Sequence, residues 1–519
     1  MIRGIEYVFY DHPYWDKEKK QNRHRRTYVG KLDRNGDFVP NAKWHALNGS
    51  ASGTNVDLPR KLATRQYCGA TYLLDEVCRE IGLTDDLRTC LPRNWQAILS
   101  LAYYLVLESD SPMYRFGRWA HDHRHPYGSE ITSQRISELV LQIPEQAKME
   151  FFRLRAARIE DGEYLAYDST SVSSYSEAIK AVRYGKNKDG DDLPQINIGI
   201  LIGERSCLPV YYRILPGNIA DVSTLPKLIL DVDFIDISRL RLVIDRGFCS
   251  RANMDRLLET DYSFVVGGTA TSGYVKRHID TTLAAAKDFR HFDELHGVFG
   301  YTYKEKWQCT SQGAKPENAG KHEKTIYVHV YYNGVRAEDE KLKFAKKVRT
   351  VAELVAGGKK LSASQESTRD KYLVVGDSVD FNDEAIRTHM DRMGYFALVS
   401  NNTITAAEAL ELYRRKDIVE KAFDNCKDRL ELRRTAVNSD AALAGTLFVQ
   451  FVALIIISGI SKRMRSADLF RTHTMQSLLD ALDVIERYDY HGIAPHFGEI
   501  TNKQALLYQS MGVSSPNTL

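Results

Sequence analysis

Two kinds of hydrophobic spacing alternate along the chain. Between residues 60 and 157, apolar positions recur every three or four residues, as in NWQAILSLAYYLVLE, and this spacing predicts helices. From Glu163 onward, short apolar runs predict five strands: EYLAYD, QINIGILI, PVYYRIL, LRLVIDRGF and YSFVVGG. Two predicted helices, STLPKLILDV and SRANMDRLLET, lie among the later strands. This order predicts an α/β fold in which helices pack on a mixed sheet.

A further block of strands and helices separates these strands from the last part of the predicted core. GVFGYTYKEKWQC and KTIYVHVYYNGV have strand character, YNGV predicts a hairpin turn, and EDEKLKFAKKVRTVAELVAG predicts a charged helix. The strand GYFALVSNN and the helix YRRKDIVEKAFDNCKDRL follow. A strand–helix–strand unit needs only about 30 residues. We therefore expect residues 269–392 to be a β-rich insertion in a core made of residues 159–268 and 393–470.

The outer segments predict three more regions: a small strand-containing basic module in residues 1–58, a helical region in 59–158 and a C-terminal helical region in 471–519. Within the module, KEKKQNRHRR carries six Lys or Arg against one Glu. It is either an electrostatic grip on DNA phosphates or a solvated charged hairpin. Its candidate DNA contacts are Lys19, Lys20, Arg23, Arg25 and Arg26. In the helical region, a helix such as SQRISELV either enters a major groove or only packs on its neighbours.

Composition narrows the class of protein without identifying it. The 519 residues are 43% hydrophobic and 27% charged, with a mean hydropathy of −0.38, as in ordinary globular proteins. The net charge is only +3, so an acidic partner must meet local basic patches. Seven scattered cysteines without a CxxC pair argue for reduced thiols in the cytosol, and against a disulfide framework or zinc finger. The first residues contain no apolar signal core.

One apolar stretch, residues 441–460, could be taken for a membrane span. Thr446, Gln450 and Ser458 interrupt it, and its longest unbroken apolar run, residues 451–457, is too short to cross a bilayer. We expect a buried helix in a large core and no membrane partner.

Three carboxylates stand where catalysis could use them. Asp168 and Asp245 each end a predicted strand, and Glu420 lies on a predicted helix. Oxygen ligands of this kind suit Mg²⁺, and two such ions about 4 Å apart can stabilise the entering and leaving oxygens at a phosphorus atom. Each aspartate alone is equally typical of a turn or helix cap. If the three meet in space, their mutual repulsion calls for a cation.

The helix around Glu420 carries an aligned polar edge. Tyr413, Lys416, Glu420 and Lys427 lie at offsets of 0, 3, 7 and 14, which places them within roughly a 60° arc at about 100° per residue. The neighbouring face is apolar and can pack on a core. The edge is either a set of solvated charges or a carboxylate flanked by cations that meet a substrate.

Trp307, in the predicted insertion, is a candidate for stacking on an extruded base, although a tryptophan at such a position also serves as a core residue.

Three segments together resemble the DDE transposases of bacterial insertion sequences, above all the large fourth insertion-sequence group. They are YDSTSVSSYS around Asp168, VIDRGF around Asp245 and YRRKDIVEKAFDNCKDRLELRR around Glu420. The group's helix motif is a tyrosine, two residues, an arginine, three residues, a glutamate, six residues and a lysine. Tyr413, Glu420 and Lys427 match this spacing, while Lys416 replaces the arginine, which keeps the charge but loses the planar fork.

The resemblance implies a ribonuclease-H-like core interrupted by a β-rich insertion, with residues 59–158 binding the DNA ends. Asp168, Asp245 and Glu420 would bind two Mg²⁺ ions, for which Mn²⁺ is expected to substitute. Water would first attack the phosphodiester at the element end, and the freed 3′ hydroxyl would then attack target DNA. Tyr413, Lys416 and Lys427 would hold the backbone.

The resemblance also implies partners and a location. The partners are double-stranded DNA, as terminal repeats and target, and a second copy of the chain in a homodimer. The location is the bacterial cytoplasm, at the nucleoid. Two other functions remain open: a ribonuclease-H-like nuclease without strand transfer, and a domesticated, catalytically silent DNA-binding protein. The three intact carboxylates count against the silent protein.

Overall fold

The structure is a computed structural model that describes residues 6–16, 21–33, 36–44, 64–185, 192–235, 240–260, 262–284, 287–309, 322–376, 378–430, 434–435, 437–489 and 495–516. The chain divides into two compact units, Met1–Thr64 with Tyr490–Ala494, and Arg65–Asp489 with Pro495–Leu519. The finer domain boundaries expected from the sequence stay predictions.

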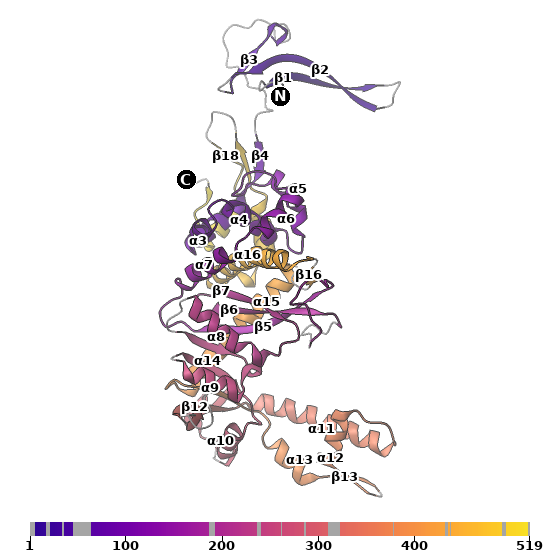
Figure 1. Ribbon diagram of the computed structural model, residues 1–519, viewed down its shortest axis with the longest axis vertical. Coiled ribbons are helices and arrows are strands. Elements are labelled where there is room, and N and C mark those ends of the chain that lie inside the picture. Colours follow the sequence, from indigo (N-terminus) through magenta and orange to yellow (C-terminus); the bar gives the residue numbers. More distant parts are fainter. Residues whose placement is uncertain are drawn as a thin grey trace. The chain divides into compact units, whose positions relative to one another are not determined.

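The first unit contains a three-stranded antiparallel sheet (Figure 1). Its strands are β1 (Tyr7–Asp16), β2 (Gln21–Leu32) and β3 (Phe38–Pro40). β1 and β2 pair along their whole length, with Tyr14 opposite Arg23. This pairing confirms the strand content predicted for the basic module.

The centre of the second unit is a mixed sheet in the order β9-β8-β5-β6-β7. The strands are β5 (Leu165–Ser174), β6 (Gln195–Gly203), β7 (Pro209–Pro216), β8 (Arg241–Ile244) and β9 (Ser263–Gly268). β5, β6 and β7 form an antiparallel meander, and β8 and β9 lie parallel to β5. Helices α8 (Leu225–Phe234) and α9 (Arg251–Glu259) connect the later strands. This is the ribonuclease-H-like α/β arrangement, so the predicted fold class is confirmed.

A strand of the second predicted core segment, β15, and three strands of the predicted insertion extend the same sheet. β15 (Tyr395–Ser400), β12 (His322–Tyr332), β11 (Val298–Cys309) and β10 (Phe292–Asp293) continue outward from β9, each antiparallel to the one before. The expected hairpin turn at YNGV is wrong. Asn333 instead caps a helix, because its side-chain oxygen accepts from the Arg336 N–H at 2.9 Å.

That helix, α11 (Gly334–Ala356), opens a small subdomain with its own core. The other elements are α12 (Ala363–Tyr372), β13 (Leu373–Val375), β14 (Val379–Phe381) and α13 (Asp383–Met390). Val348, Val351, Tyr372 and Leu373 form its buried centre. The predicted charged helix is confirmed as part of α11.

Helices cover the other end of the central sheet, as the spacing in residues 60–157 predicts. They are α2 (Gly69–Glu80), α3 (Leu83–Cys90), α4 (Trp95–Leu107), α5 (Phe116–Asp122), α6 (Ser133–Leu141) and α7 (Glu145–Ala156). The long helix α16 (Asp440–Ser466) packs among them (Figure 1). Gly445 allows the closest approach, because a Cβ there would lie 1.9 Å from the Val140 carbonyl oxygen on α6.

α16 contains the apolar stretch noted in the sequence. By length and composition it passes as a membrane span, but 89% of its most apolar window is buried inside the protein. The prediction of a buried core helix is confirmed.

Candidate active site

Asp168 and Asp245 lie beside each other on neighbouring parallel strands. The last paired residues of β5 and β8 are Tyr167 and Ile244. Asp168 and Asp245 are the next residues of the two strands, and paired strands lie about 4.8 Å apart. The expectation that β5 ends at Asp168 is wrong, since it continues to Ser174 and pairs with β6. Asp168 is instead the first residue of β5 beyond its pairing with β8.

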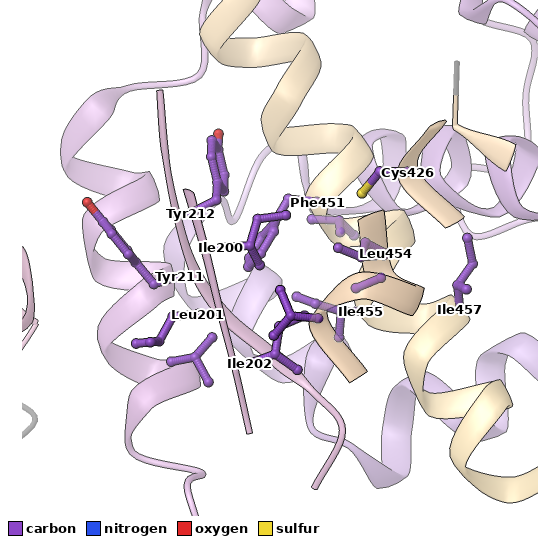
Figure 2. Close-up of a cluster of buried hydrophobic side chains, with 14 of the residues drawn as sticks. Ile200, Leu201, Ile202, Tyr211, Tyr212, Cys426, Phe451, Leu454, Ile455 and Ile457 are labelled. Carbon is purple, nitrogen blue, oxygen red and sulfur yellow. The ribbon is translucent and has the colours of Figure 1, made fainter. Parts of the chain in front are cut away.

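Glu420 reaches this edge from a helix docked on the sheet. Val419, Ala422, Phe423 and Cys426 of α15 (Asp417–Arg429) are buried, while Glu420 is exposed. Phe423 and Cys426 meet a layer formed by β5, β6 and α16, to which Thr170, Val172, Ile198, Ile200, Phe451 and Leu454 contribute. Figure 2 shows part of this layer. Burial of one large apolar side chain contributes about 1.5–3 kcal/mol, so the apolar face fixes the helix and leaves its polar edge at the strand ends.

Asp168 faces the same helix. Residues two apart on a strand point to the same side of a sheet, and Thr170 and Val172 face α15. The fold therefore turns all three predicted carboxylates toward one region.

The predicted single helix around Glu420 is two helical segments. α14 (Ala406–Arg415) ends before Lys416, and α15 begins at Asp417. At the junction, the Lys416 N–H donates to the Tyr413 carbonyl at 3.2 Å, a three-residue step that tightens the turn. The prediction that the four polar side chains lie within one arc of a single straight helix is therefore wrong for Tyr413, which belongs to α14.

Tyr413 nevertheless reaches the site, because its hydroxyl donates to Asp245 Oδ1 at 2.8 Å. Burial pushes the pKa of Asp245 upward. The Tyr413 hydroxyl, the Lys416 ammonium and two backbone N–H groups outweigh burial, so the pKa of Asp245 lies below its ordinary value. Burial and the negative Asp245 raise the pKa of Tyr413, which therefore stays protonated as a donor.

Lys416 is the cation at the centre of this arrangement. Its Nζ lies 2.9 Å from Glu420 Oε1 and 3.8 Å from Asp245 Oδ1, and the residue is 5% exposed. Burial is the largest influence on its pKa and lowers it. The hydrogen bond to Glu420 and the charges of Asp245 and Asp168 together outweigh burial, so the pKa of Lys416 lies above its ordinary value. The three carboxylates thus act on one positive charge.

The chemistry of these groups fits a hard divalent cation, since all three offer carboxylate oxygen. Among the residues that the structure describes, no group of three or more His, Cys, Asp or Glu side chains is spaced to hold a metal ion. The present spacing is that of an ion-pair cluster around Lys416. Metal binding by Asp168, Asp245 and Glu420 stays a prediction.

The predicted DNA contacts fall at different places. Lys427 is half-buried on α15, two turns beyond Glu420. Arg23 and Arg25 are exposed on β2, whereas Arg26 lies on the other face, 3.8 Å from Asp11. Lys19 and Lys20 lie outside the described residues.

Trp307 is a core residue in this structure. It is 5% exposed, and its indole N–H donates to Asp255 Oδ1 at 2.7 Å. Tyr274 contacts the ring edge-on, and the Arg251 guanidinium lies over the ring, 4.7 Å from its centre. These neighbours cover the ring, and base stacking by Trp307 stays a prediction.

Two features that position the site were not recognised from the sequence. Arg415 donates to the buried Glu204 Oε2 at 2.8 Å, which ties α14 to the end of β6. Gly267 on β9 leaves room for the Tyr413 side chain, since a Cβ there would lie 2.8 Å from the Tyr413 hydroxyl. The glycine pair in YSFVVGG was the available signal for Gly267, whereas no local pattern marks the Arg415–Glu204 pair.

Comparison with known proteins identifies the family. Residues 160–456, more than half of the chain, match the family described as "Transposase DDE domain". The chain therefore belongs to the DDE transposases, proteins of DNA transposition and recombination. This confirms the transposase prediction; the insertion-sequence group stays a prediction.

The other comparisons add little. No curated protein matches the chain. Among solved structures, it is similar to a piggyBac transposase in a synaptic complex with hairpin DNA, at 9% identity and a TM-score of 0.38, covering 80% of this chain and 76% of that one. A likeness at this level supports no inference about the site.

Proposed function

We propose that this transposase belongs to a bacterial insertion sequence of the fourth group or its relatives, and that it cleaves DNA at the element ends and joins the freed ends to target DNA. The observation that carries the proposal is the meeting of Asp168, Asp245 and Glu420 around Lys416 on a ribonuclease-H-like sheet. Divalent metal ions generally serve DDE transposases. Double-stranded DNA is the proposed substrate, and the bacterial cytoplasm the proposed location.

In the first step, a water oxygen attacks the phosphorus at the element end, the bond from phosphorus to the 3′ oxygen breaks, and a 3′ hydroxyl is released. In the second step, that hydroxyl attacks a target phosphodiester and displaces its 3′ oxygen. Asp168, Asp245 and Glu420 would hold Mg²⁺ or Mn²⁺, which when bound supplies charge stabilisation for the entering and leaving oxygens.

The remaining residues have proposed roles in holding the groups in place. Tyr413 orients Asp245 through its 2.8 Å hydrogen bond. Lys416 aligns Glu420 and Asp245, and with Lys427 it meets the DNA backbone near the scissile phosphate. Of the basic residues predicted to bind DNA, Arg23 and Arg25 share one face of β2 and are the proposed backbone contacts, whereas Arg26 lies beside Asp11 on the other face. A homodimer would give each of two DNA ends its own site.

The test incubates the purified protein with its own element ends and Mg²⁺ or Mn²⁺. We expect the wild type to cut the ends and join them to a target plasmid. The Glu420→Gln variant should bind the ends with unchanged affinity and cut nothing. Equal cutting by Glu420→Gln would refute the role of Glu420.

The same assay separates the two rival functions. A simple nuclease would cut without joining, and a silent DNA-binding protein would shift the DNA and never cut it. Mass photometry of the complex with end DNA tests the homodimer, since two chains per complex are expected and one chain per complex would contradict it.

A further inference from the structure

The subdomain of α11 to α13 contains an open pocket that the catalytic proposal does not use. The pocket lies between α11, α12 and α13 and has a volume of about 360 Å³. Its floor is aromatic: the ring centres of Phe344 and Tyr372 are 4.9 Å apart, and those of Phe344 and His389 are 4.6 Å apart. Tyr372 belongs to the small core, so the floor is fixed by packing.

The walls of this pocket are basic and hydroxylated. Ser364, Ser367 and Lys371 line it from α12, and Lys347 lines it from α11. Positions 364, 367 and 371 are three and four residues apart, which places their side chains on one face of the helix. Among the described residues that line the pocket, none is acidic.

Four other cations of α11 form ion pairs within that helix, whereas Lys347 of α11 and Lys371 of α12 do not. Arg336 pairs with Glu340 at 2.7 Å, Lys341 with Glu338 at 2.8 Å and Lys343 with Asp339 at 2.6 Å. Lys347 and Lys371 form no ion pair with any acidic residue that the structure describes. The two pocket lysines therefore keep positive charge that no ion pair with a described acidic residue compensates, as does Lys346, which does not line the pocket.

His389 responds to this positive charge. Burial lowers its pKa, and the charges of Lys371, Arg392 and Lys347 lower it further, against a smaller opposing influence of Glu340. A neutral imidazole and two serine hydroxyls next to two ammonium groups can all hydrogen-bond to a phosphate oxygen.

We propose that this pocket binds a backbone phosphate of DNA, which makes the insertion a second DNA-contacting surface apart from the carboxylate site. The inference rests on the proposed use of DNA as substrate. Lysines bind phosphate as point charges, and hydroxyl groups commonly contact the backbone without reading sequence. The pocket therefore contributes affinity and register, not base specificity.

The experiment compares two double variants of the full chain that remove the same charge. Lys347→Gln/Lys371→Gln empties the pocket of its cations, and Lys341→Gln/Lys343→Gln removes two paired lysines of α11. Binding to a fluorescent duplex is measured by anisotropy across a salt series. Each neutralised phosphate contributes a slope of about −0.9 in log K against log salt.

We expect the pocket variant to bind about tenfold more weakly, with a salt slope shallower by about one. The paired-lysine control should match the wild type in slope. Equal slopes and affinities for both double variants would overturn the proposal while leaving the transposase function intact. A wild type that fails to bind any duplex would overturn the proposed function as well.

Inorganic phosphate distinguishes a DNA phosphate from a free anion. Thermal unfolding of the wild type and the pocket variant is followed with and without added phosphate. If phosphate stabilises only the wild type and duplex affinity is the same in both, the pocket serves a free phosphate and the DNA assignment is wrong. Loss of duplex affinity in the pocket variant, with unchanged thermal unfolding without phosphate, supports the assignment.

Discussion

Lys416 and Glu420, one helical turn apart, form an ion pair of 2.9 Å in which the lysine is almost fully buried and the glutamate is exposed. The same ammonium lies 3.8 Å from Asp245. Two carboxylates from different elements are thus aligned by one cation. The buried ammonium needs these partners, since a buried charge that loses its partner is costly, and the two carboxylates are in turn held near one another by their attraction to Lys416.

Replacing Lys416 tests this dependence. Lys416→Met keeps most of the side-chain volume but removes the charge, and we expect DNA-end cleavage to fall about 10- to 100-fold, the range typical of groups that orient metal ligands. Lys416→Arg keeps the positive charge, introduces the arginine of the motif that this helix resembles, and should retain most of the activity. Cleavage of a labelled end duplex gives the rates. A Met variant as fast as the wild type would contradict the aligning role.

The two faces of the β1–β2 ribbon predict different effects for adjacent arginines. Arg25 shares a face with Tyr10 and Tyr14, which are 55% and 43% exposed. Arg26 lies on the opposite face with Asp11, which also accepts from His24 at 2.9 Å. A two-stranded ribbon fits the major groove of duplex DNA, so the face with Arg23 and Arg25 is the expected contact.

We expect Arg25→Gln to weaken duplex binding and to reduce the salt slope by about 0.9, one phosphate contact. Arg23→Gln should act in the same way. Arg26→Gln, which removes the same charge one residue away, should leave the slope unchanged. Anisotropy titrations over a salt series give all three slopes. If Arg26→Gln lowers the slope as much as Arg25→Gln does, the contact is not restricted to one face.

Local sequence patterns predicted the elements that carry the carboxylates. The run LRLVI is apolar except for Arg241 and ends before Asp245, and β8 ends at Ile244. The apolar positions of α15 are its buried face. In both cases the spacing of apolar residues within a short segment is enough to predict the element and its buried face. No knowledge of distant contacts is needed for β8 or α15.

Other features depend on distant contacts and could not be predicted in this way. β5 continues through DSTSVSS because β6 satisfies its polar groups, as in the 3.1 Å bond from the Ser171 hydroxyl to Asn197 Oδ1. The step between α14 and α15 has neither proline nor glycine to mark it. It accompanies the hydrogen bond of Tyr413 and the ion pair of Lys416 with Asp245, a residue 168 positions away from Tyr413.

Trp307 offers a test of core packing against base stacking. Trp307→Phe keeps a ring in the core but leaves Asp255, a buried carboxylate, without its indole donor. A buried group that loses its hydrogen bond costs about 1–3 kcal/mol. We expect urea unfolding to report a loss of this size while DNA-end cleavage at low temperature stays near wild type. Unchanged stability with impaired cleavage would instead support a role at the DNA.

Acid should destabilise the protein through buried neutral histidines. His329 is fully buried, and burial lowers its pKa to about 4 from an ordinary 6.5. His125 is lowered to about 4 as well, mainly by burial. The unfolded chain takes up these protons near pH 6.5, whereas the folded protein does so only near pH 4. The stability that depends on neutral histidine is therefore complete above pH 6.5 and is lost as the pH falls toward 4.

Each such histidine steepens the fall of unfolding free energy by about 1.4 kcal/mol per pH unit within that window. His329→Gln can still hydrogen-bond to Ser400 and Thr302, which contact the imidazole at 3.0 and 2.9 Å, but it does not titrate. Urea unfolding between pH 7 and 4.5 should therefore give a shallower slope for this variant, by about 1 kcal/mol per pH unit. The exposed His291 provides the control, since His291→Gln should keep the wild-type slope. A slope unchanged by His329→Gln would mean that this imidazole is already protonated in the folded protein.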